Sequence, residues 1–174
     1  MSNGHVPSSK VVTMMVDAHE HAACVASWME QATNGLPPGR LIQAFERGFA
    51  ALWGRANRTL ADVTLMAILD RVLYVAAEQY PFVSALKVEA DGLRCQDLQA
   101  RADSLVLDQL AQGIRFVLVE FLTVLGNLTA EILTPALHSE LLKVAPSKGG
   151  PHENGSRGGG PSPKIDTGEE RAKS

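Results

Sequence analysis

A line of polar side chains in the second half of the chain has the residue types that acid–base catalysis uses. Carboxylate, hydroxyl and amide side chains recur there at intervals of three and four residues, so a helix would place them along one side. A shorter line with similar spacing stands in the middle of the chain. Two carboxylates can act as a general acid and a general base when burial tunes their pKa values. If the two lines face each other, they form a candidate polar cleft of Asp70, Tyr74, Glu120, Asn127 and Glu131, flanked by Glu78, Thr123 and His138.

We expect this candidate polar cleft to be ordinary surface or a subunit contact rather than an active site. Polar lines on helices more often face solvent than a substrate. The sequence contains no P-loop, no dinucleotide-binding glycine motif, no zinc-protease motif and no nucleophile elbow. We therefore assign no catalytic residue and expect no cofactor.

A second group has the residue types of a metal site. Asp17, His21 and Cys24 follow one another at intervals of four and three residues, and all three are acceptable zinc ligands. His19 cannot join them, because on a helix it points about 200° away from His21. Since no second His/Cys cluster offers a fourth ligand, we expect no metal and a solvated edge of the first helix. The remaining alternative is a pH-sensitive contact through His21.

Four arginines form a third candidate site, an interaction surface. Arg40, Arg47, Arg55 and Arg58 fall on the side of a predicted helix opposite its apolar face. Guanidinium groups bind carboxylates and phosphates, so this face could meet an acidic protein partner. Nucleic acid is an unlikely partner, because the whole chain has a net charge of -3 and carries no recognisable nucleic-acid module.

Apolar periodicity predicts that helices position all of these residues. We expect an all-α fold, a bundle of four to five helices. Apolar residues cover most of the circumference of the third helix, and the fourth is also long and apolar, so we expect these two helices at the centre of the bundle. Thr59 has the residue type of an N-cap for the third helix. The predicted helices span about 10–31, 37–57, 60–80, 105–133 and 135–144.

A small β-hairpin is a possible insertion near residues 86–95. Alternating residues flank the turn signal Ala90-Asp91-Gly92, which favours two short antiparallel strands. The alternative is an irregular connection with a short helix over 96–102. A lone hairpin is marginal in water, so it must lie on the helices or pair with another copy.

The composition divides the chain into three parts. Residues 145–174 contain seven Gly and four Pro, and their only branched aliphatic is Ile165, so we expect a disordered tail. Residues 1–9 are polar and predict a flexible N-terminus, which leaves 10–144 as the helical domain. No secretory signal or transmembrane segment is recognised, and the two cysteines form no CxxC motif, so we expect a cytoplasmic protein.

These observations favour a non-enzymatic protein–protein interaction or regulatory module. Ala/Arg/Leu/Val-rich usage is typical of GC-rich bacteria, and we expect a bacterial signalling adaptor. The aliphatic faces exceed what one small bundle needs to bury, which predicts a homodimer. One alternative is a sensor that binds a small apolar ligand between its helices. The other alternative is a helical enzyme that uses buried carboxylates.

Overall fold

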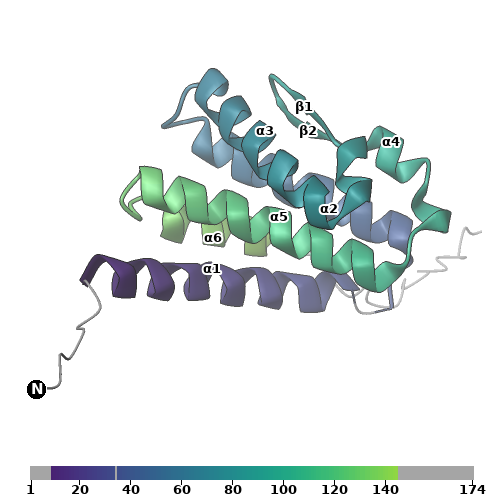
Figure 1. Cartoon of the computed structure of the whole chain (residues 1–174), viewed down its shortest axis with the longest axis horizontal. Coiled ribbons are helices and arrows are strands. Elements are labelled where there is room, and N and C mark those ends of the chain that lie inside the picture. Colours follow the sequence, from purple (N-terminus) through teal and green to yellow (C-terminus); the bar gives the residue numbers. More distant parts are fainter. Residues whose placement is uncertain (1–8, 34, 145–174) are drawn as a thin grey trace, which may run out of the picture.

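The computed structural model describes residues 9–33 and 35–144, and it describes the side chains of 18–32 and 35–144. The predicted tail at 145–174 and the first eight residues lie outside this part of the chain. The all-α fold with a small hairpin is confirmed (Figure 1). The elements are α1 (Ser9–Thr33), α2 (Pro38–Ala56), α3 (Asp62–Gln79), η1 (Pro81–Ala85), β1 (Lys87–Glu89), β2 (Gly92–Arg94), α4 (Gln96–Gln99), η2 (Ala102–Ser104), α5 (Leu107–Leu128) and α6 (Thr134–Lys143).

Helix α5 forms the centre of the described bundle. It contacts α1 along one side and α3 along another, and it also touches α2 and α6. In Figure 1, α5 runs between α1 below it and α3 above it. Its apolar residues recur at helical spacing and are buried on the sides that meet these helices. The buried set on α5 comprises Leu110, Gly113, Ile114, Val117, Leu118, Phe121, Leu122, Leu125 and Gly126.

The apolar face predicted for the second helix is confirmed. Pro38 occupies the first turn of α2, where a missing N–H removes no helical hydrogen bond. One side of α2 packs against α5 and α6, and the hairpin and α4 cover part of the same helix. The buried side chains are Leu41, Ile42, Ala44, Phe45, Phe49, Leu52, Trp53 and Ala56.

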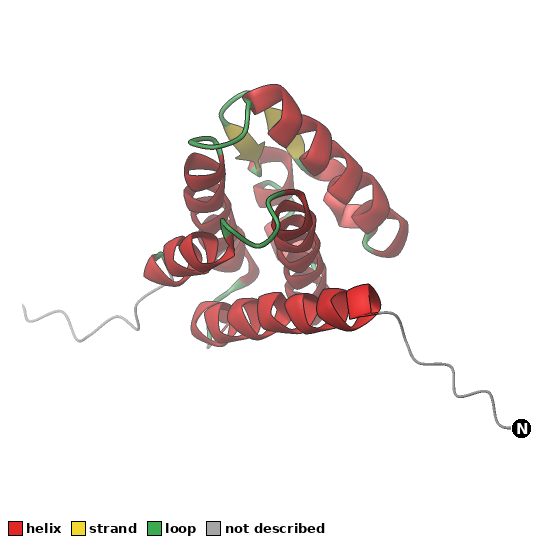
Figure 2. Ribbon diagram, turned by 90° about the vertical axis from the view of Figure 1, so that its left-hand side faces the viewer, coloured by secondary structure: helices red, strands yellow, loops and turns green. Residues whose placement is uncertain are grey.

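The predicted hairpin is also confirmed, and it lies on the helices. Val88 pairs with Leu93 across the two antiparallel strands. Gly92 has a φ of 129°, a conformation that favours glycine, and its Cα faces the Trp53 ring of α2. Leu93 is buried there, so the hairpin gains the apolar support that an isolated two-stranded unit lacks. In both views, the hairpin lies on the side of the molecule away from α1 (Figure 2).

Two predictions about the third helix are wrong. The helix begins at Asp62, and Thr59 is not its N-cap. The backbone N–H groups of Thr59 and Leu60 instead donate to the carbonyl of Ala56, which extends the end of α2 as a turn. The helix is also peripheral rather than central: Val63 is 77 % exposed, and the buried residues occupy one side only.

The predicted fourth helix ends at Leu128, five residues earlier than its apolar pattern indicated. Ala130 and Glu131 have φ angles of 47° and 61°, in the left-handed region that non-glycine residues rarely adopt. These two residues turn the chain, and α6 then begins at Thr134. The break removes Glu131 from the polar line of α5 and directs its side chain toward α1.

Candidate functional site

A cluster of two histidines and a glutamate joins three segments of the chain. His21 of α1 is fully buried, and its Nδ1 lies 2.9 Å from Nε2 of His138 on α6. The two rings meet edge to face, with their planes at 86°. On the other side of the His21 ring, Nε2 lies 3.6 Å from Oε2 of Glu131 in the α5–α6 connection. We call His21, His138 and Glu131 the histidine cluster.

The left-handed turn after α5 places Glu131 in this cluster. Its carboxylate accepts a hydrogen bond from the Thr134 hydroxyl at the start of α6. The same carboxylate covers the backbone of Gly126, where a Cβ atom would lie 2.6 Å from Glu131 Oε2. Consecutive non-glycine residues at positive φ each cost about 1–3 kcal/mol, and such strain is concentrated at functional sites. The strained turn therefore marks this cluster as a candidate functional site.

Electrostatics keep the His138 ring largely neutral. Burial lowers the pKa of His138 from its ordinary value of 6.5, and the neighbouring His21 ring acts in the same direction. The carboxylates of Glu20 and Glu131 favour the charged form and oppose this shift. A neutral ring has one nitrogen that accepts, which the hydrogen bond between the two histidines requires.

The geometry of the histidine cluster does not suit a metal ion. His21 faces His138 with Nδ1 and Glu131 with Nε2, on opposite sides of one ring, so the three side chains cannot share one ion. Among the side chains that the structure describes, no three His, Cys, Asp or Glu residues are arranged to hold a metal. The Asp17 side chain considered above lies outside the described residues.

The prediction that His21 lies on a solvated edge is wrong. His21 stands four residues before Val25 and seven before Trp28, and both of these side chains are fully buried. This spacing is the sequence signal that could have placed His21 on the buried face. Cys24 lies half-buried one turn farther along the same helix.

The structure does not bring the five residues of the candidate polar cleft together by hydrogen bonds. Asp70 and Asn127 are exposed, and Tyr74 is 72 % exposed. Glu120 is half-buried on α5, and Glu131 belongs to the histidine cluster. Within the described part of the chain, no hydrogen bond or ion pair joins any two of these five residues. His138, which flanked the predicted cleft, does lie in the same cluster as Glu131, but their common neighbour is His21.

The four arginines predicted as an interaction surface lie on or just beyond α2. Arg40, Arg47 and Arg58 are exposed and Arg55 is half-buried. Arg40, Arg47 and Arg55 lie within about 80° of one another around the axis of α2, at 100° per residue. Arg58 belongs to the turn that follows the helix. We call these four residues the arginine face.

A shallow depression of about 280 Å³ lies at one end of the arginine face. The small residues Ala51 and Gly54 of α2 line it, together with Arg55, Arg58 and, from α6, Glu140. Glu140 is the only acid in this lining, and it pairs with Lys143 at 2.9 Å. Among the described residues, no ion pair neutralises either arginine of the depression.

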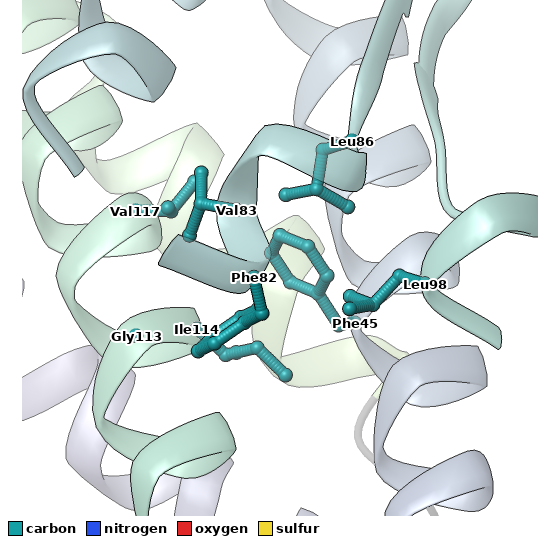
Figure 3. Close-up of a pocket in the computed structure, with 8 residues that line it drawn as sticks. All are labelled: Phe45, Phe82, Val83, Leu86, Leu98, Gly113, Ile114 and Val117. Carbon is teal, nitrogen blue, oxygen red and sulfur yellow. The ribbon is translucent and has the colours of Figure 1, made fainter. Parts of the chain in front are cut away.

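Another gap, in the apolar interior, is too narrow to hold a ligand. It lies where η1 and α4 meet α2 and α5, and it has no room for a water-sized sphere (Figure 3). Figure 3 shows the side chains of Phe82, Leu86 and Leu98 directed into this space. The eight residues that surround the gap are Phe45, Phe82, Val83, Leu86, Leu98, Gly113, Ile114 and Val117.

The length and composition of α5 bear on the question of a membrane. Within the described residues, α5 is the one helix long and apolar enough to cross a bilayer, and half of its apolar window is buried in the fold. The core helix of a soluble protein passes the same test, so this finding is weak evidence.

Comparison with known proteins gives no further guide to either site. No family model, curated protein or solved structure matches this chain. The function is therefore argued from the arginine face and the histidine cluster themselves.

Proposed function

We propose that this protein is a non-enzymatic helical interaction module, a signalling adaptor that binds an acidic segment of a protein partner through the arginine face. The observation that carries the proposal is the depression at Arg55 and Arg58. Among the described residues, no carboxylate pairs with these arginines, because the one carboxylate in the lining, that of Glu140, pairs with Lys143. A guanidinium pair beside small residues gives an incoming carboxylate both charge and room to approach.

The chemistry of the arginine face favours a peptide carboxylate over a nucleic-acid backbone. Nucleic-acid binding relies on many phosphate contacts and a broad basic surface. Here the basic group is small, four arginines with Lys143 nearby on α6, and Glu46 and Glu140 lie on the same two helices. The chain as a whole is acidic, with a net charge of -3, which would oppose binding to a long polyanion.

Charge reversal at the depression tests this proposal. A fluorescent peptide of alternating Glu and Leu serves as the acidic probe, and its anisotropy is measured against the full chain. We expect Arg55→Glu/Arg58→Glu to weaken binding by more than about tenfold, because charge-assisted hydrogen bonds contribute about 1.5–3 kcal/mol each. Added salt should weaken binding to the parent chain as well, since exposed charges are screened.

A matched variant distinguishes the effect of the depression on peptide binding from the effect of the net charge. Arg71→Glu/Arg115→Glu makes the same change in net charge at two exposed arginines outside α2. We expect this control to bind the acidic peptide within about twofold of the parent chain. Equal losses in the two double variants would contradict a site at the depression. Tighter binding of a single-stranded oligonucleotide than of the peptide would contradict a protein partner.

We also propose that the module acts as a homodimer. Exposed large apolar side chains support this, notably Val63 on α3 at 77 % exposure and Ile132 in the α5–α6 connection at 80 %. Sedimentation equilibrium at micromolar concentration should then give twice the chain mass of 18.6 kDa. A single species of 18.6 kDa across the concentration range would overturn the dimer and leave the arginine face untouched.

The two alternative functions have less support than an interaction module. A sensor for a small apolar ligand needs an apolar cavity, and the gap beside Phe82 admits no water-sized sphere. A helical enzyme needs carboxylates that converge in a pocket, and Asp70 is exposed, with no hydrogen bond or ion pair to Glu120 or Glu131 among the described residues. Of the residues predicted for the cleft, Glu131 alone lies in the histidine cluster.

A further inference from the structure

We propose that the His21–His138 pair is a pH-sensitive latch that holds α1 against α6 and releases it when both rings are protonated. The proposal is independent of the arginine face, because the latch joins α1 to α6 and involves neither Arg55 nor Arg58. Its basis is the placement of two titratable rings in direct contact, one of them fully buried, beside a carboxylate held by a strained turn.

The hydrogen bond between the rings limits how many protons the pair can hold. His21 Nδ1 and His138 Nε2 lie 2.9 Å apart, so one nitrogen must donate and the other must accept. With both rings neutral, this requirement is met by the choice of tautomer. With one added proton it is still met, because His21 can donate from Nδ1 to His138 and direct its second N–H toward Glu131.

A second proton removes the only acceptor between the rings. Both facing nitrogens then carry a hydrogen, and two positive charges stand at hydrogen-bond distance in a partly buried site. Glu131 and Glu20 attract the charged His138 ring, but neither supplies an acceptor between the two facing nitrogens, because Glu131 lies beside Nε2 of His21 on the other side of that ring. The two rings must then separate.

The groups around the pair determine the direction of the pH effect. Burial and the His21 ring lower the pKa of His138, whereas Glu20 and Glu131 oppose the shift. In the released state the solvated ring regains its ordinary pKa of 6.5 and binds the proton more readily. Release therefore becomes more favourable as the pH falls below about 6.5, by at most about tenfold per pH unit for one proton. Above that pH the released state binds no extra proton, so the latch stays closed.

Release at His21 would uncover the inner side of α1. His21 shares that side with Val25 and Trp28, which are fully buried against the bundle. In the described part of the chain, α1 makes its main contacts with α5, α6 and α2, and the thiol of Cys24 is free rather than joined in a disulfide. Opening of the latch at acidic pH would thus expose the apolar inner side of α1.

Amide hydrogen exchange of the full chain tests the latch. Exchange is followed by mass spectrometry between about pH 7.5 and about pH 5, with each rate corrected for intrinsic exchange. We expect the protection of α1 peptides around His21 to fall at least about tenfold toward acid, while α2 peptides change much less. His138→Gln keeps an acceptor beside His21 and cannot be protonated, so this dependence should disappear. His19→Gln alters an exposed histidine of the same helix and should leave it unchanged.

Three results would overturn the proposal. They are pH-independent protection of α1 in the parent chain, unchanged pH dependence in His138→Gln, and loss of the dependence in His19→Gln. If His138→Gln does not fold, Glu131→Gln decides the matter. It removes the negative charge beside His21 Nε2, so the first proton binds less readily. Release should then occur at a different pH than in the parent chain, and an identical profile would refute the latch.

Discussion

Phe49→Ala should lower the free energy of unfolding by about 3–5 kcal/mol, the range for deletion of a large buried aromatic side chain. Phe49 is fully buried on α2. Its ring centroid lies 4.7 Å from that of Phe121 on α5 and 6.0 Å from that of Phe45. The substitution therefore leaves a cavity between α2 and the central helix. Because domains are stable by only about 5–15 kcal/mol, this loss takes up a large share of the total.

Urea denaturation followed by circular dichroism measures this effect. Phe49→Leu keeps most of the volume and should cost about 1–1.5 kcal/mol. Tyr74→Ala removes an aromatic ring that is 72 % exposed, and it should change stability by no more than about 0.5 kcal/mol. A loss below about 1 kcal/mol for Phe49→Ala would show that α2 and α5 do not pack as described.

The sequence predicted the fold best where one local pattern and the tertiary structure agree. Apolar spacing predicted one apolar side for the helix over 37–57, opposite its arginines, and the structure buries Leu41, Phe45 and Leu52 on that side of α2, because a helix keeps this spacing whatever it packs against. The turn signal at Asp91-Gly92 predicted the hairpin for a similar reason, since Gly92 takes a positive φ that other residues avoid.

The sequence predicted less where a distant contact overrides local preference. The apolar run after Leu107 continues past Leu128, and nothing in it announces left-handed conformations at Ala130 and Glu131. The contacts of Glu131 with Thr134 and with His21, far away on α1, accompany that turn. His21 was misplaced for the same reason, because its partner His138 stands 117 residues later.

The sequence predicted part of the arginine face but not all of it. Periodicity placed Arg40, Arg47 and Arg55 on the exposed side of α2, as the structure does. Periodicity could not show that Glu140 of α6 lies beside Arg55 and pairs with Lys143, because that arrangement depends on how α6 packs on α2. That Arg55 and Arg58 lack an ion-pair partner among the described residues thus depends on tertiary structure, and the proposed function depends on this feature.

Gly113→Ala and Gly54→Ala make the same chemical change in two helices and should have effects of opposite sign. A Cβ at Gly113 would lie 2.9 Å from Cε1 of Phe82, closer than real Cβ atoms approach other atoms, and 3.1 Å from Cγ of Tyr80, tighter than most real contacts. A Cβ at Gly54 would meet nothing within 4 Å. Both substitutions gain about 1 kcal/mol of helix propensity. Gly113→Ala should nevertheless lose about 1–2 kcal/mol of stability, because overpacking costs up to about 3 kcal/mol.

Thermal and urea unfolding give the free energy of unfolding of each variant. We expect Gly54→Ala to be more stable than Gly113→Ala by about 2–3 kcal/mol, and this difference is the steric cost at Gly113 because both variants gain the same helix propensity. Figure 3 shows Gly113 on α5 beside the gap that the Phe82 ring enters. A smaller side chain at position 82 should therefore relieve the clash with a Cβ at position 113. Gly113→Ala/Phe82→Leu is therefore expected to be more stable than the sum of its single variants by about 1 kcal/mol or more. Additive effects would mean that η1 does not pack on α5 through this ring. The contact between Phe82 of η1 and Gly113 of α5 would then not help to hold η1 beside the central helix. It would not help to hold the hairpin that follows η1 either.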